Sequence, residues 1–121
     1  MYGKIISKAE ADEQFDSVLV SIAIQEDSLQ ELLTRVEKNI MFKIVSDSVF
    51  VLDDNRNVII PEGWSISDEE VYILYSKSIL IELLNKGKSE IIFIEQRKSV
   101  LTITNGNLTL EYGYPCPPYC N

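Results

Sequence analysis

Two cysteines near the C-terminus are the side chains best suited to covalent or metal chemistry. They lie in the segment Cys116-Pro117-Pro118-Tyr119-Cys120, in which Cys116, Tyr119 and Cys120 are the candidate functional residues. The spacing is not the C-x-x-C of thioredoxin-like enzymes, and two thiolates fall short of a four-ligand zinc site. A local disulfide needs Cα atoms within about 7 Å, so the Pro-Pro segment would have to fold back. The sequence leaves open a disulfide, a zinc site shared with a second chain, a modified peptide, and a reduced tail packed on a sheet.

Other residue types give no catalytic pattern. The chain has no histidine, which removes the commonest general base and the commonest metal ligand. Oxygen-bearing side chains at 53, 55 and 57 match the opening of a calcium loop, but Val58 and Trp64 occupy the positions that require glycine and glutamate. Residues 53–57 are therefore predicted to form a turn. We assign no catalytic, cofactor-binding or metal-binding residue, and an enzyme is not favoured.

Trp64 is the single tryptophan. It lies in a linker that follows Pro61 and precedes Ser67. An exposed tryptophan would be a candidate contact residue for a partner protein. A buried one would cover the open end of a core.

Composition restricts the choice of partner. The 121 residues carry a net charge of −8, which repels nucleic acid and anionic membranes. No apolar run approaches the roughly 18 residues that span a bilayer. We expect no nucleic acid and no membrane as partner, and a cytoplasmic location unless a signal segment has been removed from the chain.

The chain contains an internal repeat. Aligning Val20–Asp53 with Val71–Thr104 gives ten identities in 34 positions, at an offset of 51. A shared apolar pattern at a fixed offset indicates a structural repeat. We therefore predict one globular domain with a first copy at about 17–61, a second at about 68–113, and a C-terminal tail at 114–121.

Periodicity predicts the elements of the first copy. Alternating apolar residues predict a strand at 18–24. A capping box at Ser28–Glu31, followed by apolar residues at helical spacing, predicts a helix over 28–38. Three further strands are predicted, at 41–45, 49–52 and 58–60. Another capping box, at Ser7–Glu10, predicts a short helix near the N-terminus.

The second copy is ambiguous at 68–86. The capping box at Ser67–Glu70 suggests one long helix, but the apolar residues that follow point in every direction. Alignment with the first copy instead predicts a strand at 70–75 and a helix at 77–86 that stops at Gly87. The strands that follow are predicted at 90–96, 100–104 and 108–112. Asn105-Gly106, between the last two, favours a type I′ turn.

The predicted fold is α+β, with two β-α-β-β-β repeats related by a pseudo-two-fold axis. The sheet is largely antiparallel, and two helices pack on one face. This order of elements resembles one domain of a DNA sliding clamp, which is also a doubled unit of similar length. Clamps turn basic helices toward DNA, whereas acidic residues outnumber basic ones here, so the activity is not carried over. The basic residues of the predicted helices are Arg35, Lys38, Lys77 and Lys86.

Three hypotheses for function follow. The leading one is a non-enzymatic binding or accessory protein that engages another protein or its own copy. The second is a small-ligand-binding or catalytic domain with a pocket between the copies. The third places the function in the Cys-Pro-Pro-Tyr-Cys tail.

Overall fold

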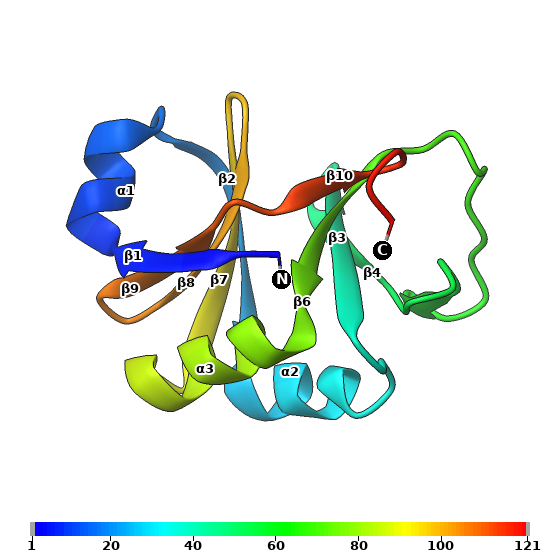
Figure 1. Ribbon diagram of the computed structural model, residues 1–121, viewed down its shortest axis with the longest axis horizontal. Helices are drawn as coiled ribbons and strands as arrows, with labels where there is room; N and C mark the ends of the chain where they lie inside the picture. The colour runs from blue at the N-terminus through cyan, green and yellow to red at the C-terminus, as the bar shows by residue number, and fades with distance from the viewer. Residues whose placement is uncertain (1, 121) are drawn as a thin grey trace.

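A computed structural model describes residues 2–120. The described chain forms two five-stranded antiparallel sheets and three helices (Figure 1). Sheet A has the order β1 (Lys4–Ser7), β9 (Leu108–Glu111), β8 (Leu101–Asn105), β7 (Ile91–Arg97), β2 (Val18–Gln25). Sheet B has the order β10 (Tyr114–Cys116), β6 (Tyr72–Ser76), β3 (Asn39–Val45), β4 (Ser48–Leu52), β5 (Val58–Ile60). The helices are α1 (Lys8–Gln14), α2 (Glu26–Leu33) and α3 (Lys77–Gly87).

The strand-then-helix assignment of residues 70–86 is confirmed. The chain forms β6 and passes directly into α3 at Lys77. The apolar side chains of this stretch point in every direction because its strand and its helix bury different faces. Leu74 and Tyr75 are fully buried in sheet B, and Leu80 and Leu83 are fully buried on the inner face of α3.

The prediction for α2 is wrong at both ends. The helix covers Glu26–Leu33 instead of 28–38, and Ser28 lies inside it rather than capping it. No side chain caps its N-terminus, but Glu26 and Asp27 occupy the first turn, where carboxylates stabilise the helix dipole. At the other end, the Thr34 hydroxyl donates to the Glu31 carbonyl at 2.6 Å. This hydrogen bond satisfies a carbonyl of the last turn, and the helix ends there.

Residues 2–120 form three helices rather than two, and these helices do not share one face. The predicted helix start at Ser7 is confirmed, since the Ser7 hydroxyl accepts from the Glu10 amide at 3.1 Å and caps α1. The Glu10 carboxylate accepts from the Ser7 hydroxyl at 3.2 Å rather than from the Ser7 amide, so only half of the predicted capping box is seen. In Figure 1, α2 and α3 lie side by side beneath the two sheets, whereas α1 lies beside sheet A.

Two apolar clusters hold the layers together. The main cluster joins α2 and α3 to the inner residues of both sheets. A second, smaller cluster lies under the C-terminal segment and consists of Met41, Phe50, Leu52, Tyr72, Leu74 and Cys116. The segment predicted as a tail therefore contains a strand, β10, and covers apolar side chains.

The turn after β8 differs from the predicted type I′ form. Of the two residues Asn105-Gly106, only Gly106 has a positive φ, of 63°. Asn105 is instead the last residue of β8, and its amide caps α3 by donating to the carbonyls of Leu83 and Leu84. Gly87 is needed for this contact, because a Cβ there would lie 2.2 Å from the Asn105 side chain. The left-handed residue that ends α3 is Lys88, not Gly87.

Asp54 anchors the segment between α2 and β3. Its carboxylate accepts from the amides of Glu37, Lys38 and Asn39 at 2.6, 2.9 and 2.9 Å. Burial by itself would raise the pKa of this carboxyl, but the three donated hydrogen bonds outweigh burial and hold the pKa below its ordinary value. The predicted turn at 53–57 is thus also the point that fixes the start of β3.

We expect the substitution Asp54→Asn to lower the free energy of unfolding by about 1–2 kcal/mol at pH 7, because an amide offers weaker and fewer acceptors. The folded-state pKa is depressed, so the stabilisation is present above the unfolded pKa of about 3.9 and is lost as pH falls through the lower folded pKa. Urea unfolding at several pH values checks this. Asp47→Asn, in the exposed β3–β4 turn, is the control, and a difference that persists undiminished in strong acid would contradict the role of the charge.

Candidate functional site

Strand β2 forms a long free edge of sheet A. It has eight residues, and within residues 2–120 it pairs with no strand but β7. An antiparallel edge strand bonds its neighbour through alternate residues, so about half of its N–H and C=O groups point outward. Residues 17–25 contain no charged side chain. This edge can therefore accept another strand without burying a charge.

The other sheet edges carry protection that β2 lacks. β1 has four residues and begins with Lys4, β5 has three residues and is followed by Pro61, and β10 has three residues including Pro115. Short length, lysine and proline are the usual devices that prevent edge-to-edge pairing. β2 has a bulge between Val18 and Val20 at its start, but its remaining length is regular.

Apolar side chains lie beside the free edge. Leu19 is 66% exposed, and on the neighbouring strand Phe93 is 39% exposed. Ala23 pairs with Phe93 in register, so the two side chains share one face of sheet A. A groove of about 490 Å³ also lies beside β2, next to α2 and sheet B, and it is lined by Ala23, Ile24, Ser28, Glu31, Leu32, Val49 and Ile60. A strand added to β2 would meet apolar surface on both of its faces.

The Gln25 end of β2 is acidic. A second cavity, of about 590 Å³, is lined there by Glu26, Asp27 and Glu90, against one basic residue, Lys88. No ion pair within 4.0 Å neutralises these carboxylates in the described part of the chain. One oxygen of Glu26 is buried without a hydrogen-bond partner. This end of the edge therefore favours a positively charged neighbour.

The cysteine segment is packed and bonded. Cys116 is fully buried, and it forms a disulfide with Cys120 across a Cα–Cα distance of 4.8 Å. Tyr119 is 55% exposed and stacks edge-on against Tyr114, whose ring contacts Tyr2. Of the alternatives that the sequence left open, the fold contains the local disulfide, on a tail that packs against sheet B.

Arg56 holds this region together, and sequence reasoning missed it. Its guanidinium donates to the carbonyls of Cys116 at 2.8 Å and Glu70 at 2.6 Å, and it lies over the ring of Tyr72. The residue adopts a positive φ of 64°. A turn residue thus joins the tail, the 61–71 loop and β6, and the only sequence signal was an arginine within a predicted turn.

Trp64 does not close the core. It is 61% exposed and meets Phe50 edge-on at 5.6 Å between ring centroids. It lies in the loop over sheet B, on a different sheet from β2. The structure therefore keeps Trp64 separate from the exposed edge.

A buried charged network lies between sheet A and α1. Arg97 lies one residue beyond the strand predicted at 90–96, but in the structure it is the last residue of β7 and its side chain is fully buried. It donates to Asp12 at 3.2 Å and to the Thr102 hydroxyl at 3.1 Å, and Glu95 accepts from Thr102 and Thr104. The partners come from distant segments, so this network fastens α1 to the sheet.

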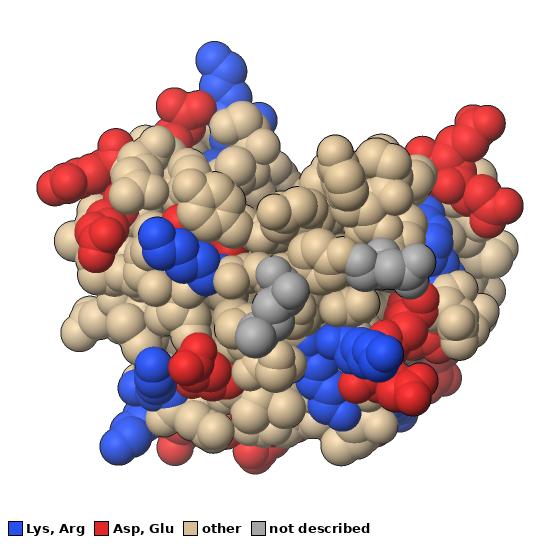
Figure 2. Space-filling view, viewed as in Figure 1, with Lys and Arg blue, Asp and Glu red and all other residues tan. Residues whose placement is uncertain are grey.

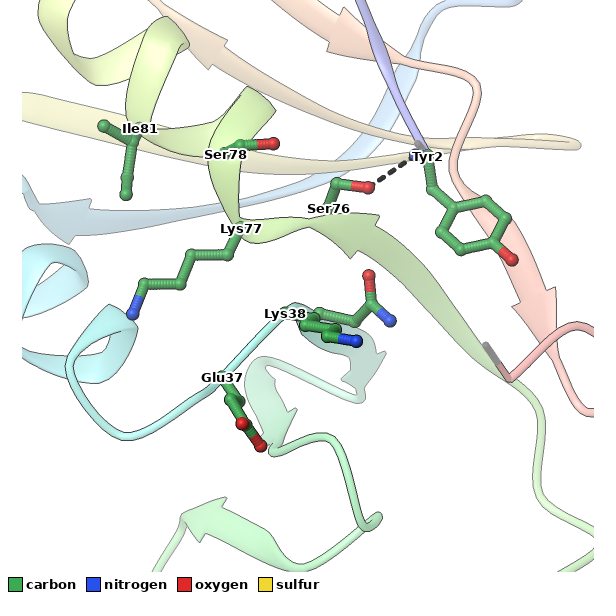
Figure 3. A pocket seen from close by; sticks show the side chains of 8 residues that line it. Tyr2, Glu37, Lys38, Ser76, Lys77, Ser78 and Ile81 are labelled. Atoms are coloured by element: carbon green, nitrogen blue, oxygen red, sulfur yellow. Dashed lines mark hydrogen bonds between the residues drawn. The ribbon is translucent and has the colours of Figure 1, made fainter.

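A cavity of about 530 Å³ lies where the two predicted copies meet (Figure 3). Its lining residues are Tyr2, Glu37, Lys38, Asn39, Ser76, Lys77, Ser78 and Ile81. The charged ends of Glu37, Lys38 and Lys77 point in different directions in Figure 3, and the Lys77 ammonium donates to the Val36 carbonyl at 2.9 Å. These groups do not converge on one point, so the cavity holds no acid–base pair.

Two searches of the described residues complete the description. In residues 2–120 no group of three or more His, Cys, Asp or Glu side chains is placed to hold a metal ion. Within the same range, no helix has both the length and the apolar character needed to cross a membrane.

Comparison with protein families, with curated proteins and with solved structures found no match to this chain. The resemblance to a sliding-clamp domain accordingly rests on the order of elements alone. Function has to be argued from the surfaces described above.

We expect Arg56→Gln to destabilise the fold by about 2–4 kcal/mol, because it leaves backbone carbonyls of the tail and loop without a charged donor. Urea unfolding at neutral pH measures this. Arg35→Gln is the matched control, because Arg35, just after α2, forms a solvent-exposed ion pair with Glu31, and such pairs contribute under about 1 kcal/mol. Equal effects of the two substitutions would show that Arg56 is not a structural clip.

Truncation after Gly113 should lower stability by at least about 2 kcal/mol, because it removes β10 and uncovers the apolar cluster of sheet B. Reducing the disulfide in the full chain should cost less, since β10 and its pairing with β6 stay in place. Thermal unfolding of the three forms makes the comparison. A truncated protein as stable as the full chain would instead favour a tail that acts independently of the fold.

Proposed function

We propose that this protein is a non-enzymatic protein-binding domain, and that its binding surface is the free edge of β2 with the apolar side chains beside it. The carrying observation is an eight-residue edge strand that has neither charge nor proline. A partner segment would add to sheet A as a sixth strand, through main-chain hydrogen bonds, and its side chains would supply specificity.

The charges select the kind of partner. In a strand antiparallel to β2, the N-terminal end would lie beside Gln25 and the acidic residues Glu26, Asp27 and Glu90. An extended segment with apolar residues at alternate positions and a lysine or arginine at its N-terminal end fits this surface.

A second copy of the chain fits less well. Two β2 strands paired about their centres would set Asp16 of each copy against Asp27 of the other. Asp16 precedes β2 and Asp27 lies in the first turn of α2, so these like charges would repel each other at the two ends of the strand pair, and each copy carries a net charge of −8. Nucleic acid is disfavoured for the same reason, and on the face in Figure 2 acidic and basic side chains lie in small mixed groups.

Two further expectations belong to this proposal. One is that the fold consists of two related copies. It is supported by the exchange of first strands, since β2 pairs with β7 and β6 pairs with β3, and by a helix that follows each of these strands without a loop. The other is a cytoplasmic location. The disulfide between Cys116 and Cys120 argues against a cytoplasmic location, because disulfides persist mainly in oxidising compartments. Counting free thiols in the protein isolated from cells under alkylating conditions tests this expectation, since two free thiols would support a cytoplasmic location and none would oppose it.

Selection from a displayed library of random decapeptides tests the binding surface. We expect the enriched peptides to alternate apolar residues, to carry a basic residue near the N-terminus, and to protect β2 amides from hydrogen exchange. Ala23→Lys should weaken their binding at least tenfold, because it places a charge beside the edge and repels the basic end.

Ser65→Lys is the control, since it makes the same charge change in an exposed loop over sheet B. A library that yields no binder, or peptides that bind the Ala23→Lys variant as well as the parent, would contradict the proposal. Sedimentation equilibrium tests whether a second copy of the chain occupies the β2 edge. A dimer that is lost in the Ala23→Lys variant would identify the second copy as the occupant.

A further inference from the structure

The disulfide between Cys116 and Cys120 lies against a cationic side chain. Nη1 of Arg56 is 3.3 Å from the Cys116 Sγ atom and donates to the Cys116 carbonyl at 2.8 Å. The two residues are 60 positions apart in the sequence, so only the fold brings the guanidinium to the sulfur. A neutral disulfide sulfur is a weak hydrogen-bond acceptor. The bonded form of the cysteine pair therefore makes little use of this cation.

Arg56 lacks an anionic partner within the described chain. Its half-buried guanidinium donates to neutral carbonyls, and among the described residues no carboxylate oxygen lies within 4.0 Å of it. The Glu70 carboxylate is instead bonded to Lys43 at 3.6 Å and to the Ser67 amide at 2.9 Å. A partly desolvated cation gains more from an anion than from a neutral acceptor. A thiolate at Cys116 would supply an anion where the sulfur already lies.

The two cysteines differ in exposure. Cys116 is fully buried, whereas Cys120 is partly exposed, so Cys120 is the one that an attacking thiol can approach. A thiolate that attacks one sulfur of a disulfide expels the other, and a stabilised thiolate leaves faster. Attack at Cys120 expels the Cys116 sulfur, which is the one beside Arg56. Exposure and charge therefore favour the same direction of reaction.

The contacts around Cys116 do not depend on the disulfide bond. Cys116 pairs with Tyr72 in the register of β10 and β6, and its carbonyl accepts from Arg56. The turn that follows is closed by the Tyr119 amide, which donates to the Pro115 carbonyl at 2.9 Å. These hydrogen bonds remain available after reduction, so the Cys116 sulfur stays beside Arg56 and its partner thiol stays within reach. The change is therefore reversible within the folded protein.

We propose that Cys116 and Cys120 form a redox-active disulfide, which a dithiol reduces in the folded protein and which Arg56 poises for reduction. A thiolate of the dithiol attacks the Cys120 sulfur, and the S–S electron pair leaves with Cys116 as a thiolate held by Arg56. The second sulfur of the dithiol, as a thiolate, then attacks the first and expels the Cys120 thiolate. The dithiol becomes an internal disulfide and gives up two electrons to the two cysteines. Of its two protons, one is taken up by Cys120 and one is released to solvent.

This site is separate from the proposed protein-binding edge. Cys116 belongs to β10 in sheet B, whereas the edge strand β2 belongs to sheet A. Either proposal can therefore fail without the other.

Reduction of the folded full chain by dithiothreitol at pH 7 tests the proposal. Acid-quenched and alkylated samples, analysed by mass spectrometry, give the reduction rate, which we expect to be proportional to the dithiothreitol concentration. Arg56→Gln should lower the rate constant by at least about tenfold, because it removes the charged donor from the leaving sulfur. Loss of stability in this variant would by itself speed reduction, so a slower reaction reports the charge lost at the sulfur.

Lys43→Gln is the matched control. Lys43 lies over the same Tyr72 ring as Arg56, with its ammonium 5.6 Å from the ring centroid, but it pairs with Glu70. The control removes an equal charge from the same region, and we expect its rate constant to match that of the parent chain. An equal fall in both variants would trace the effect to the charge of the region and overturn the role of Arg56.

The proposal is overturned if the reduction rate does not depend on the dithiothreitol concentration, because the disulfide would then react only after unfolding. A rate constant for Arg56→Gln equal to or above that of the parent chain also overturns it. A second measurement, on the parent chain, applies if Arg56→Gln does not fold. After a short exposure to glutathione and an acid quench, peptide mapping should find glutathione on Cys120, and glutathione on Cys116 would overturn the proposal.

Discussion

The pairing of β2 with β7 and of β6 with β3 is the constraint on which the rest of the structure depends. Each strand joins a sheet whose remaining members lie mostly in the other half of the chain, so neither sheet can be completed by one half alone. Helices α2 and α3 begin directly after these strands and are carried to the same side of the molecule (Figure 1). Their apolar faces then meet both sheets in one core.

Polar side chains hold in place the loops, the tail and the helix end that lie outside this apolar core. Asp54 accepts three amides that precede β3, Arg56 donates to carbonyls of the tail and loop, and Asn105 caps α3. Each satisfies backbone groups that would otherwise lack partners near the interior. Arg97 acts in the same way for α1, since it joins the helix to sheet A through a network of buried and half-buried partners. The fold therefore depends on a few long-range polar contacts as well as on apolar burial.

The pairing of β2 with β7, from the other half of the chain, also explains why the free edge of sheet A lies at β2. β2 pairs with β7 on one side and with no strand among the described residues on the other, so its apolar residues lie at an open edge of sheet A. A small cavity lined by Ile73, Leu101 and Pro115 has a different origin, because it forms where the 111–115 segment passes from sheet A to sheet B.

The sequence by itself determined the α+β class, most of the elements, and the split of residues 70–86 into a strand and a helix, because apolar periodicity and the repeated pattern report local burial. It also indicated the turn at 53–57. It did not reveal the roles of Arg56, Asp54, Glu95 or Arg97, because a charged residue near a turn looks alike in sequence whether it faces water or a distant carbonyl.

Only the tertiary structure decided that Cys116 and Cys120 are bonded, that the tail covers an apolar cluster, and that β2 lies at an edge. These outcomes depend on which strands become neighbours across 40 or more residues. Local patterns predict that a strand forms, but only the assembled sheets determine which of its sides is left without a partner.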